Sequence, residues 1–273
     1  HVRSRRQRQM CIRDRLDTVT SDKTLPAPAQ PAFDHPFLNA LHQRVLIGDG
    51  AMGTQLQAVD LDLDADFLGL EGCNEILNET RPDVLKQIHR AYFEAGADLV
   101  ETNTFGCNLP NLADYDIADR IEDLAYRGAN IAREVADEMG PREDDGMPRF
   151  VVGSMGPGTK LPSLGHAPYG ALRDAYVESA RGLVRGGCDA ILIETCQDLL
   201  QVKAAVLGTK EAFEQLGSRL PIIVHVTVET TGTMLLGSEI GAALTALEPL
   251  GIDMIGMNCA TGPDEMSEHL RYL

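Results

Sequence analysis

Side chains that can bind or react recur in this sequence directly after short apolar runs of strand length. At the ends of six such runs stand Asp49, Asn103, Ser154, Glu194, Thr227 or Glu229, and Cys259. Carboxylates, amides and hydroxyls can bind a small polar molecule, and a thiol can act as a nucleophile or a metal ligand. Together, these residue types suit a small zwitterion plus a thiolate or a metal, rather than a phosphosugar.

Two of these positions allow more than one interpretation. Cys259 closes the apolar run that begins at Gly251, and in barrels of alternating strands and helices this edge carries the active site. The thiol is therefore a candidate metal ligand or nucleophile, although a lone cysteine can also be a small buried hydrophobe. Asp49 lies in a glycine-rich turn, where it could accept a hydrogen bond from an amine or simply shape the turn.

The turn after Ser154 has the sequence Met155-Gly156-Pro157-Gly158. Because glycine and proline leave little side chain in this turn, we expect free backbone N–H groups there that could hold a carboxylate. The polar stretch from residue 55 to residue 80 is expected to be a functional loop.

The elements that must position these residues alternate regularly. Six apolar strand-like runs, at residues 44–47, 97–101, 150–153, 190–195, 221–228 and 251–258, alternate with stretches of helical spacing. Strands two, four and six each follow a Gly-x-Asp sequence, which is typical of a helix-to-strand junction. The alternation predicts an α/β fold with a parallel sheet, namely a (β/α)8 TIM-type barrel that is incomplete and contains about six of its eight units.

Composition excludes several classes of function. The 273 residues carry a net charge of −17, which argues against a nucleic-acid partner. The sequence contains no run of about 18 apolar residues, the length that a membrane-spanning helix needs. The six cysteines form no C-x-x-C pair, which favours reduced thiols and a cytoplasmic enzyme. The arginine-rich and then proline-rich residues 1–36 are predicted to be a disordered or extraneous leader and linker, a transit peptide being the alternative, and residues 37–273 to form the barrel domain.

Six short motifs carry a family resemblance. These are Gly48–Thr54, Gly72–Asn78, Glu101–Gly106, Gly153–Pro157, Ile193–Thr195 and Gly256–Ala260. In this order they resemble the homocysteine-binding barrel that forms the N-terminal module of cobalamin-dependent methionine synthases. The resemblance covers about residues 37–273.

The resemblance implies a methyltransferase in which zinc activates homocysteine. In that family three cysteines bind zinc, and Cys259 matches the first, whereas the adjacent pair that completes the site has no counterpart in this sequence. Asp49 and Glu194 would hold the amino group of homocysteine, and Ser154 and Asn103 would help to orient it. The methyl group would come from methylcobalamin on a domain outside this chain, and originally from 5-methyltetrahydrofolate, to give methionine.

Two alternatives remain open at this point. One is a stand-alone methyltransferase that uses betaine or S-methylmethionine as the donor, and the other is a non-catalytic homocysteine-binding fragment. With one matching cysteine, we expect that this chain alone neither binds zinc tightly nor turns over.

Overall fold

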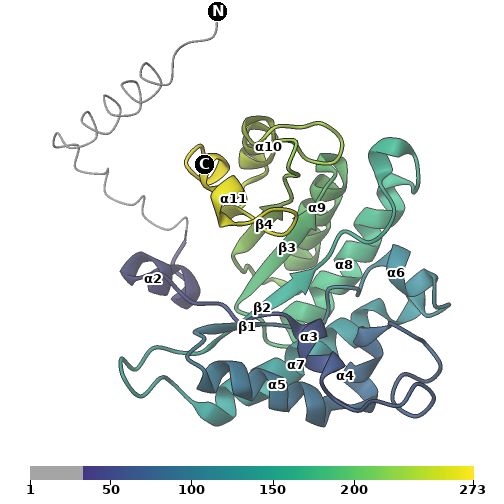
Figure 1. Cartoon of the computed structure of the whole chain (residues 1–273), viewed down its shortest axis with the longest axis vertical. Coiled ribbons are helices and arrows are strands. Elements are labelled where there is room, and N and C mark those ends of the chain that lie inside the picture. The colour runs from purple at the N-terminus through teal and green to yellow at the C-terminus, as the bar shows by residue number, and fades with distance from the viewer. Residues whose placement is uncertain (1–32) are drawn as a thin grey trace, which may run out of the picture. The chain divides into compact units, whose positions relative to one another are not determined.

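The computed structural model describes residues 33–273, so residues 1–32 of the predicted leader lie outside the described part. The core of the fold is a five-stranded parallel sheet whose strands follow one another in chain order (Figure 1). The strands are β1 (Leu99–Glu101), β2 (Phe150–Met155), β3 (Ala190–Cys196), β4 (Ile222–Val226) and β5 (Met254–Met257). The predicted α/β architecture with a parallel sheet is confirmed, and the described strands form an open sheet rather than a closed barrel.

Helices connect the strands, and the four longest of the described helices pack against the sheet (Figure 1). The α-helices are α2 (Pro36–Gln43), α3 (Met52–Gln57), α4 (Leu77–Thr80), α5 (Pro82–Glu94), α6 (Leu109–Ala113), α7 (Ile121–Met139), α8 (Tyr169–Arg185), α9 (Leu199–Leu216), α10 (Ile240–Leu247) and α11 (Pro263–Leu270). The 3-10 turns are η1 (Asn74–Ile76), η2 (Ala118–Arg120), η3 (Pro162–Leu164) and η4 (Glu248–Leu250). None of the helices between residues 33 and 273 has the length and apolar content needed to cross a membrane.

Alternation along the strands separates the core from the site. Val100, Val151 and Ile191 are fully buried in the hydrophobic core that the sheet shares with its helices. Because successive strand residues point to opposite faces, the neighbouring positions, such as Glu101, Ser154 and Glu194, face away from those helices. Three consecutive strands therefore present polar side chains on the same inner face.

The Gly-x-Asp junctions repeat as the sequence predicted. The glycine two residues before each aspartate has a positive φ, of 107°, 96° and 65° in turn, which only glycine adopts readily. Each aspartate accepts the backbone N–H of the preceding strand or strand-like segment: Asp98 from Ile47 at 2.8 Å, Asp189 from Val151 at 2.7 Å, and Asp253 from Ile222 at 2.9 Å. The junction thus ties each new strand to the one before it.

The first predicted strand, residues 44–47, differs from the prediction. The segment is irregular and is joined to β1 through one carbonyl, since Asp98 N and Leu99 N both donate to Ile47 O, at 2.7 and 3.3 Å. Val45 and Ile47 are 79% and 57% exposed, and no described strand lies on the other side of the segment. Because this single carbonyl does not make a ladder with β1, the sheet of the described residues has five strands instead of six.

Two further regions, the predicted loop at residues 55–80 and the end of the predicted linker, contain helices in the structure. Residues 55–80, predicted to be a loop, contain the end of α3, η1 and α4, and their Leu56 and Leu77 are buried in a second hydrophobic cluster with α5. Helix α2 begins at Pro36, inside the predicted linker. Its Phe37 packs edge-to-face on Phe150, with the ring centroids 5.3 Å apart, at the N-terminal end of β2.

Candidate functional site

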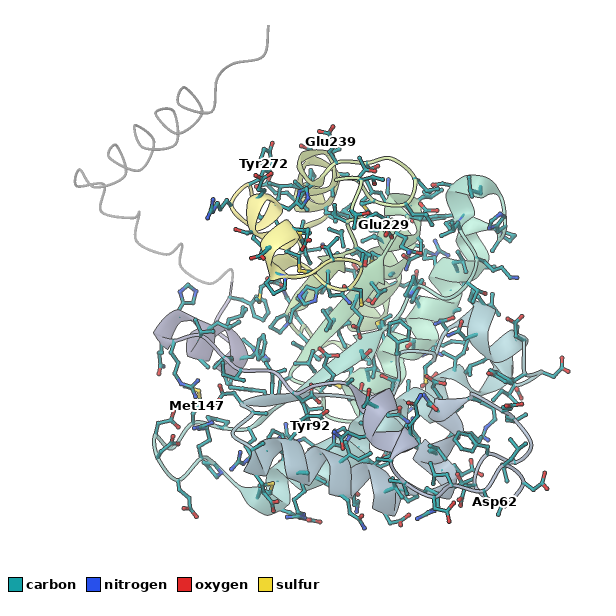
Figure 2. The ribbon with its side chains drawn as sticks, viewed as in Figure 1. Asp62, Tyr92, Met147, Glu229, Glu239 and Tyr272 are labelled. Atoms are coloured by element: carbon teal, nitrogen blue, oxygen red, sulfur yellow. The ribbon has the colours of Figure 1, made fainter. Side chains whose placement is uncertain are left out.

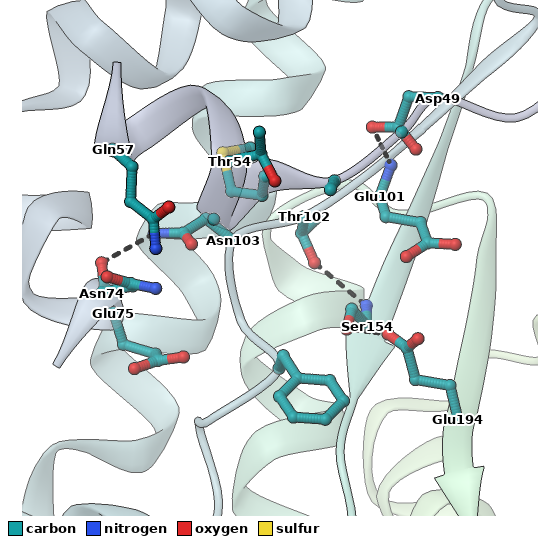
Figure 3. A pocket seen from close by; sticks show the side chains of 15 residues that line it. Asp49, Thr54, Gln57, Asn74, Glu75, Glu101, Thr102, Asn103, Ser154 and Glu194 are labelled. Carbon is teal, nitrogen blue, oxygen red and sulfur yellow. Dashed lines mark hydrogen bonds between the residues drawn. The ribbon is translucent and has the colours of Figure 1, made fainter. Parts of the chain in front are cut away.

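A pocket of about 540 Å³ opens at the C-terminal ends of β1, β2 and β3. Four carboxylates line it, from Asp49, Glu75, Glu101 and Glu194, and no Lys, Arg or His of the described residues does so. Figure 3 shows Asp49, Glu101 and Glu194 along one wall, with Asn74 and Glu75 on the opposite side. The pocket therefore has a strongly acidic wall suited to a ligand that brings a positive charge.

Asp49 stands at the top of the acidic wall, in the segment before α3. Its Oδ2 accepts the backbone N–H of Glu101 at 3.0 Å, so the carboxylate links this turn to the last residue of β1. Burial raises the pKa of Asp49 to about 7, and the nearby charge of Glu194 adds to the rise. The residue both shapes the turn and faces the pocket.

Ser154 and Glu194 form a pair across β2 and β3. Ser154 Oγ donates to Glu194 Oε1 at 2.5 Å, and Ser154 N donates to Thr102 Oγ1 at 3.0 Å. Burial raises the pKa of Glu194, while the Ser154 hydrogen bond acts in the opposite direction. Since Ser154 is only 2% exposed, it orients the Glu194 carboxylate within the pocket wall.

Asn103 lines the pocket, but its side chain is engaged within the protein. Its Nδ2 donates to Asn74 O at 2.8 Å and to Asn78 Oδ1 at 3.0 Å. In return, Asn78 Nδ2 donates to Asn103 O at 2.8 Å. Asn103 therefore fastens the loop after β1 to the Gly72–Asn78 motif, which explains why the two motifs occur together.

One backbone N–H of the predicted anion-binding turn after β2, that of Gly156, and the N–H of Ser154 before it are engaged within the protein. Ser154 N is engaged by Thr102, and Gly156 N donates to Phe105 O at 3.0 Å. A Cβ at Gly156 would lie 2.6 Å from that same oxygen, so glycine is required for the contact. These N–H groups hold two loops together instead of facing a ligand.

Glu75 fixes the loop after β1 from the other side. Its Oε1 accepts the N–H of Gly106 at 2.7 Å, and its Oε2 lies 3.9 Å from Cys73 Sγ. Burial raises the pKa of Glu75. The Glu75 carboxylate lies so close to the backbone that a Cβ at Gly106 would meet it at 2.5 Å, so a larger residue there would displace the carboxylate.

Glu101 is a pocket carboxylate that the sequence analysis missed. It is the last residue of β1 and faces the same side as Ser154 and Glu194. Burial raises its pKa, and the charges of Glu194 and then Asp49 raise it further. The signal was present in the strand alternation, but the polar residue at this exit was sought two positions later, at Asn103.

Cys259 lies at the exit of β5 with an exposed thiol. Its Sγ is 3.1 Å from Asn258 Nδ2 and 3.9 Å from Thr195 Oγ1. Cys259 is not one of the residues that line the pocket, but Thr195 directly follows the pocket residue Glu194. The thiol is thus joined to the pocket wall through one intervening residue.

Asn258 connects these two parts of the site. Its Oδ1 accepts Thr195 N at 2.9 Å, and its Nδ2 donates to Thr195 Oγ1 at 2.8 Å. Thr195 has a φ of 57°, a left-handed conformation that is costly for a β-branched residue. The sequence analysis did not identify Asn258 as a functional residue, because its side chain acts on an element 63 residues away.

The Cys259 thiol is the predicted metal ligand, and the described residues place no cluster of further ligands around it. Cys259 offers one accessible sulfur, but no three His, Cys, Asp or Glu side chains between residues 33 and 273 come together to hold a metal ion. A zinc site needs at least three protein ligands. The residues described here fit a single zinc ligand and do not form a complete site.

Comparison with known proteins decides the family. The model of the homocysteine S-methyltransferase family matches residues 46–273. The chain belongs to the homocysteine S-methyltransferase family. Methionine synthase from Mycobacterium tuberculosis is 71% identical over 241 residues, and methionine synthase from Mycobacterium leprae is 70% identical over 247 residues. The matches cover 88% and 90% of this chain, which spans about 20% of the length of each relative.

Solved structures support the fold of this homocysteine S-methyltransferase domain. The apo form of the homocysteine methyltransferase MmuM from Escherichia coli aligns with a TM-score of 0.65 at 17% identity, over 87% of this chain and 81% of that one. Its metallated form aligns with a TM-score of 0.60 at 15% identity, over 88% of this chain and 100% of that one. At this level of identity the alignments establish a shared fold.

Proposed function

We propose that this chain is the homocysteine-binding module of a methionine synthase. The observation that carries the proposal is the acidic pocket wall of Asp49, Glu101 and Glu194, with the Cys259 thiol one residue beyond its edge. Homocysteine carries an ammonium group at one end and a thiol at the other. The pocket and the cysteine therefore match the two ends of one small ligand.

The acidic wall supplies the binding energy and the orientation. Asp49 and Glu194 accept hydrogen bonds from the ammonium group, and Ser154 holds Glu194 in place through its 2.5 Å hydrogen bond. This arrangement directs the sulfur of the ligand toward the ends of β3 and β5. In the transfer, a new carbon–sulfur bond forms on the homocysteine sulfur as the methyl group leaves its donor, and the product is methionine.

Cys259 is proposed as one sulfur ligand of a zinc ion. Zinc, when bound, would keep the homocysteine sulfur deprotonated and therefore nucleophilic. The Asn258 amide donates toward Cys259 Sγ at 3.1 Å and fixes its position. That one MmuM structure is described as metallated agrees with metal binding in this fold.

The methyl donor is proposed to be methylcobalamin, recharged from methyltetrahydrofolate by other modules of a longer protein. The support is the 71% identity to a methionine synthase of which this chain spans about one fifth. A donor such as betaine or S-methylmethionine has no comparable support, and a role limited to binding homocysteine uses the same pocket.

Calorimetric titration of L-homocysteine into the 273-residue chain tests the proposal. Glu194→Gln should weaken binding by about 100-fold, because it removes a charge from the buried ammonium site. Glu239→Gln is the matched control, since Glu239 is exposed at the start of α10 near Tyr272 and does not line the pocket (Figure 2). Absence of binding by the wild type, or equal effects of both substitutions, would contradict the proposal.

A further inference from the structure

The acidic wall contains a carboxylate, that of Glu101, to which the proposed ammonium site gives no role. Asp49, Glu101 and Glu194 come from three neighbouring segments and lie one below another along the pocket in Figure 3. The other charged side chain that lines the pocket, Glu75, lies on the opposite side and carries the same sign. Within residues 33–273, no positively charged side chain of the pocket balances this set.

Glu101 differs from the other two in its contacts. Asp49 accepts the backbone N–H of Glu101, and Glu194 accepts the hydroxyl of Ser154. The Glu101 carboxylate has no hydrogen-bond or ion-pair partner among the described residues, although its backbone N–H is engaged. A carboxylate with a purely structural role would be held by a donor, so its bonding capacity is directed to the pocket.

Placing three carboxylates in one partly buried wall is unfavourable until a cation arrives. Burial is the main cause of the raised pKa values of Asp49, Glu101 and Glu194, and the charge of Glu194 adds to the rise at Asp49 and Glu101. An ammonium group carries three N–H donors and one positive charge, so it can serve three acceptors at once. The arrangement is therefore stabilised by the ligand it selects.

On the basis of the proposed function, we propose that Glu101 is a specificity-determining residue. With Asp49 and Glu194 it forms the acidic wall that faces the ammonium group of homocysteine, and it disfavours ligands that bring no positive charge. An uncharged or anionic group in the same place would leave the acidic wall without a positive charge beside it. Glu101 thus selects for α-amino acids among small thiols.

The test compares two ligands that differ only in the amino group. L-homocysteine and 4-mercaptobutanoate are titrated into the wild-type chain, Glu101→Gln, Glu101→Asp and the exposed control Glu239→Gln, each checked for folding by thermal unfolding. We expect Glu101→Gln to bind homocysteine about tenfold more weakly, a loss typical of one charged contact, and 4-mercaptobutanoate equally well or better. Glu101→Asp should keep most of the preference for the amino acid, and Glu239→Gln all of it.

The outcomes separate the possible roles of Glu101. If Glu101→Gln weakens both ligands equally, the residue acts on the structure of the pocket and the specificity proposal fails. It also fails if the ratio of the two affinities stays at the wild-type value. A wild type that binds no homocysteine refutes the proposed function itself, whereas normal wild-type binding with an unchanged ratio in Glu101→Gln refutes only the role of Glu101.

Discussion

Carboxylates stand at both ends of the parallel sheet, and they differ in their partners. At the N-terminal ends of the strands, Asp98 forms ion pairs with Arg44 at 2.7 Å and with Arg142 at 2.9 Å. The Arg44 hydrogen bond is the main reason that the pKa of Asp98 lies below its usual range. At the C-terminal ends, Asp49 and Glu101 have no cationic partner among the residues that line the pocket, and their pKa values are raised.

The paired carboxylate of Asp98 stabilises the fold, whereas we propose that the unpaired carboxylates of Asp49 and Glu101 bind a ligand. A carboxylate satisfied by arginine favours the folded state, whereas crowded carboxylates without a cation oppose folding. This contrast in partners favours the C-terminal edge as the functional end of the sheet. Three substitutions test the contrast.

The largest expected effect is at the N-terminal edge. Asp98→Ala removes a carboxylate that is 1% exposed and that Arg44, Arg142 and the N–H of Ile47 share as an acceptor. We expect a loss of about 3 kcal/mol in the free energy of unfolding, measured by urea denaturation. Asp144→Ala, which removes an exposed partner of Arg142, should leave the free energy of unfolding almost unchanged. Similar losses for both variants would show that burial of Asp98 does not matter.

A smaller effect is expected within the pocket. Ser154→Ala removes the hydroxyl that orients Glu194, while the backbone N–H to Thr102 remains. Homocysteine should bind about tenfold more weakly, with little change in unfolding free energy, because one hydrogen bond to a charged group is lost. Calorimetry measures the binding, and Ser154→Thr, which keeps a hydroxyl, is the matched variant. Equal binding by wild type and Ser154→Ala would mean that Glu194 needs no such support.

The smallest effect concerns the pH dependence of stability. The pKa of Glu101 is raised in the folded state, so as the pH rises the unfolded chain loses this proton first, and ionisation favours unfolding. Glu101→Gln should therefore gain stability relative to wild type as the pH rises from 5 to 7.5, by about 1 kcal/mol. Urea denaturation at the two pH values measures the change. A constant difference between the variants would place Glu101 in a solvated, unperturbed environment.

The sequence predicted the repeating architecture well, because it depends on local patterns. Apolar runs, helical spacing and the Gly-x-Asp junctions each act within a few residues, and the β-strands from Leu99 to Met257 follow them. The first apolar run is not a strand, because only the carbonyl of Ile47 bonds to the start of β1 and no ladder forms. Val45 and Ile47 are exposed, which an apolar composition alone does not predict.

For the site, the sequence identified residue types better than contacts. Asp49 and Glu194 line one pocket as expected, and the resemblance to the homocysteine S-methyltransferase family agrees with the family match. Asn103 and the turn at Gly156 are engaged in fastening loops, and no local pattern reveals that their partners are Asn78 and Phe105. Such pairings depend on how segments far apart in the chain meet.

Thr195 connects the ends of β3 and β5 through a backbone conformation that is rare for a β-branched residue. Its φ is 57°, and the Asn258 side chain bonds both its N–H and its hydroxyl. Glu194 directly precedes Thr195 and Cys259 directly follows Asn258, so this pair of hydrogen bonds couples the position of the carboxylate to that of the thiol.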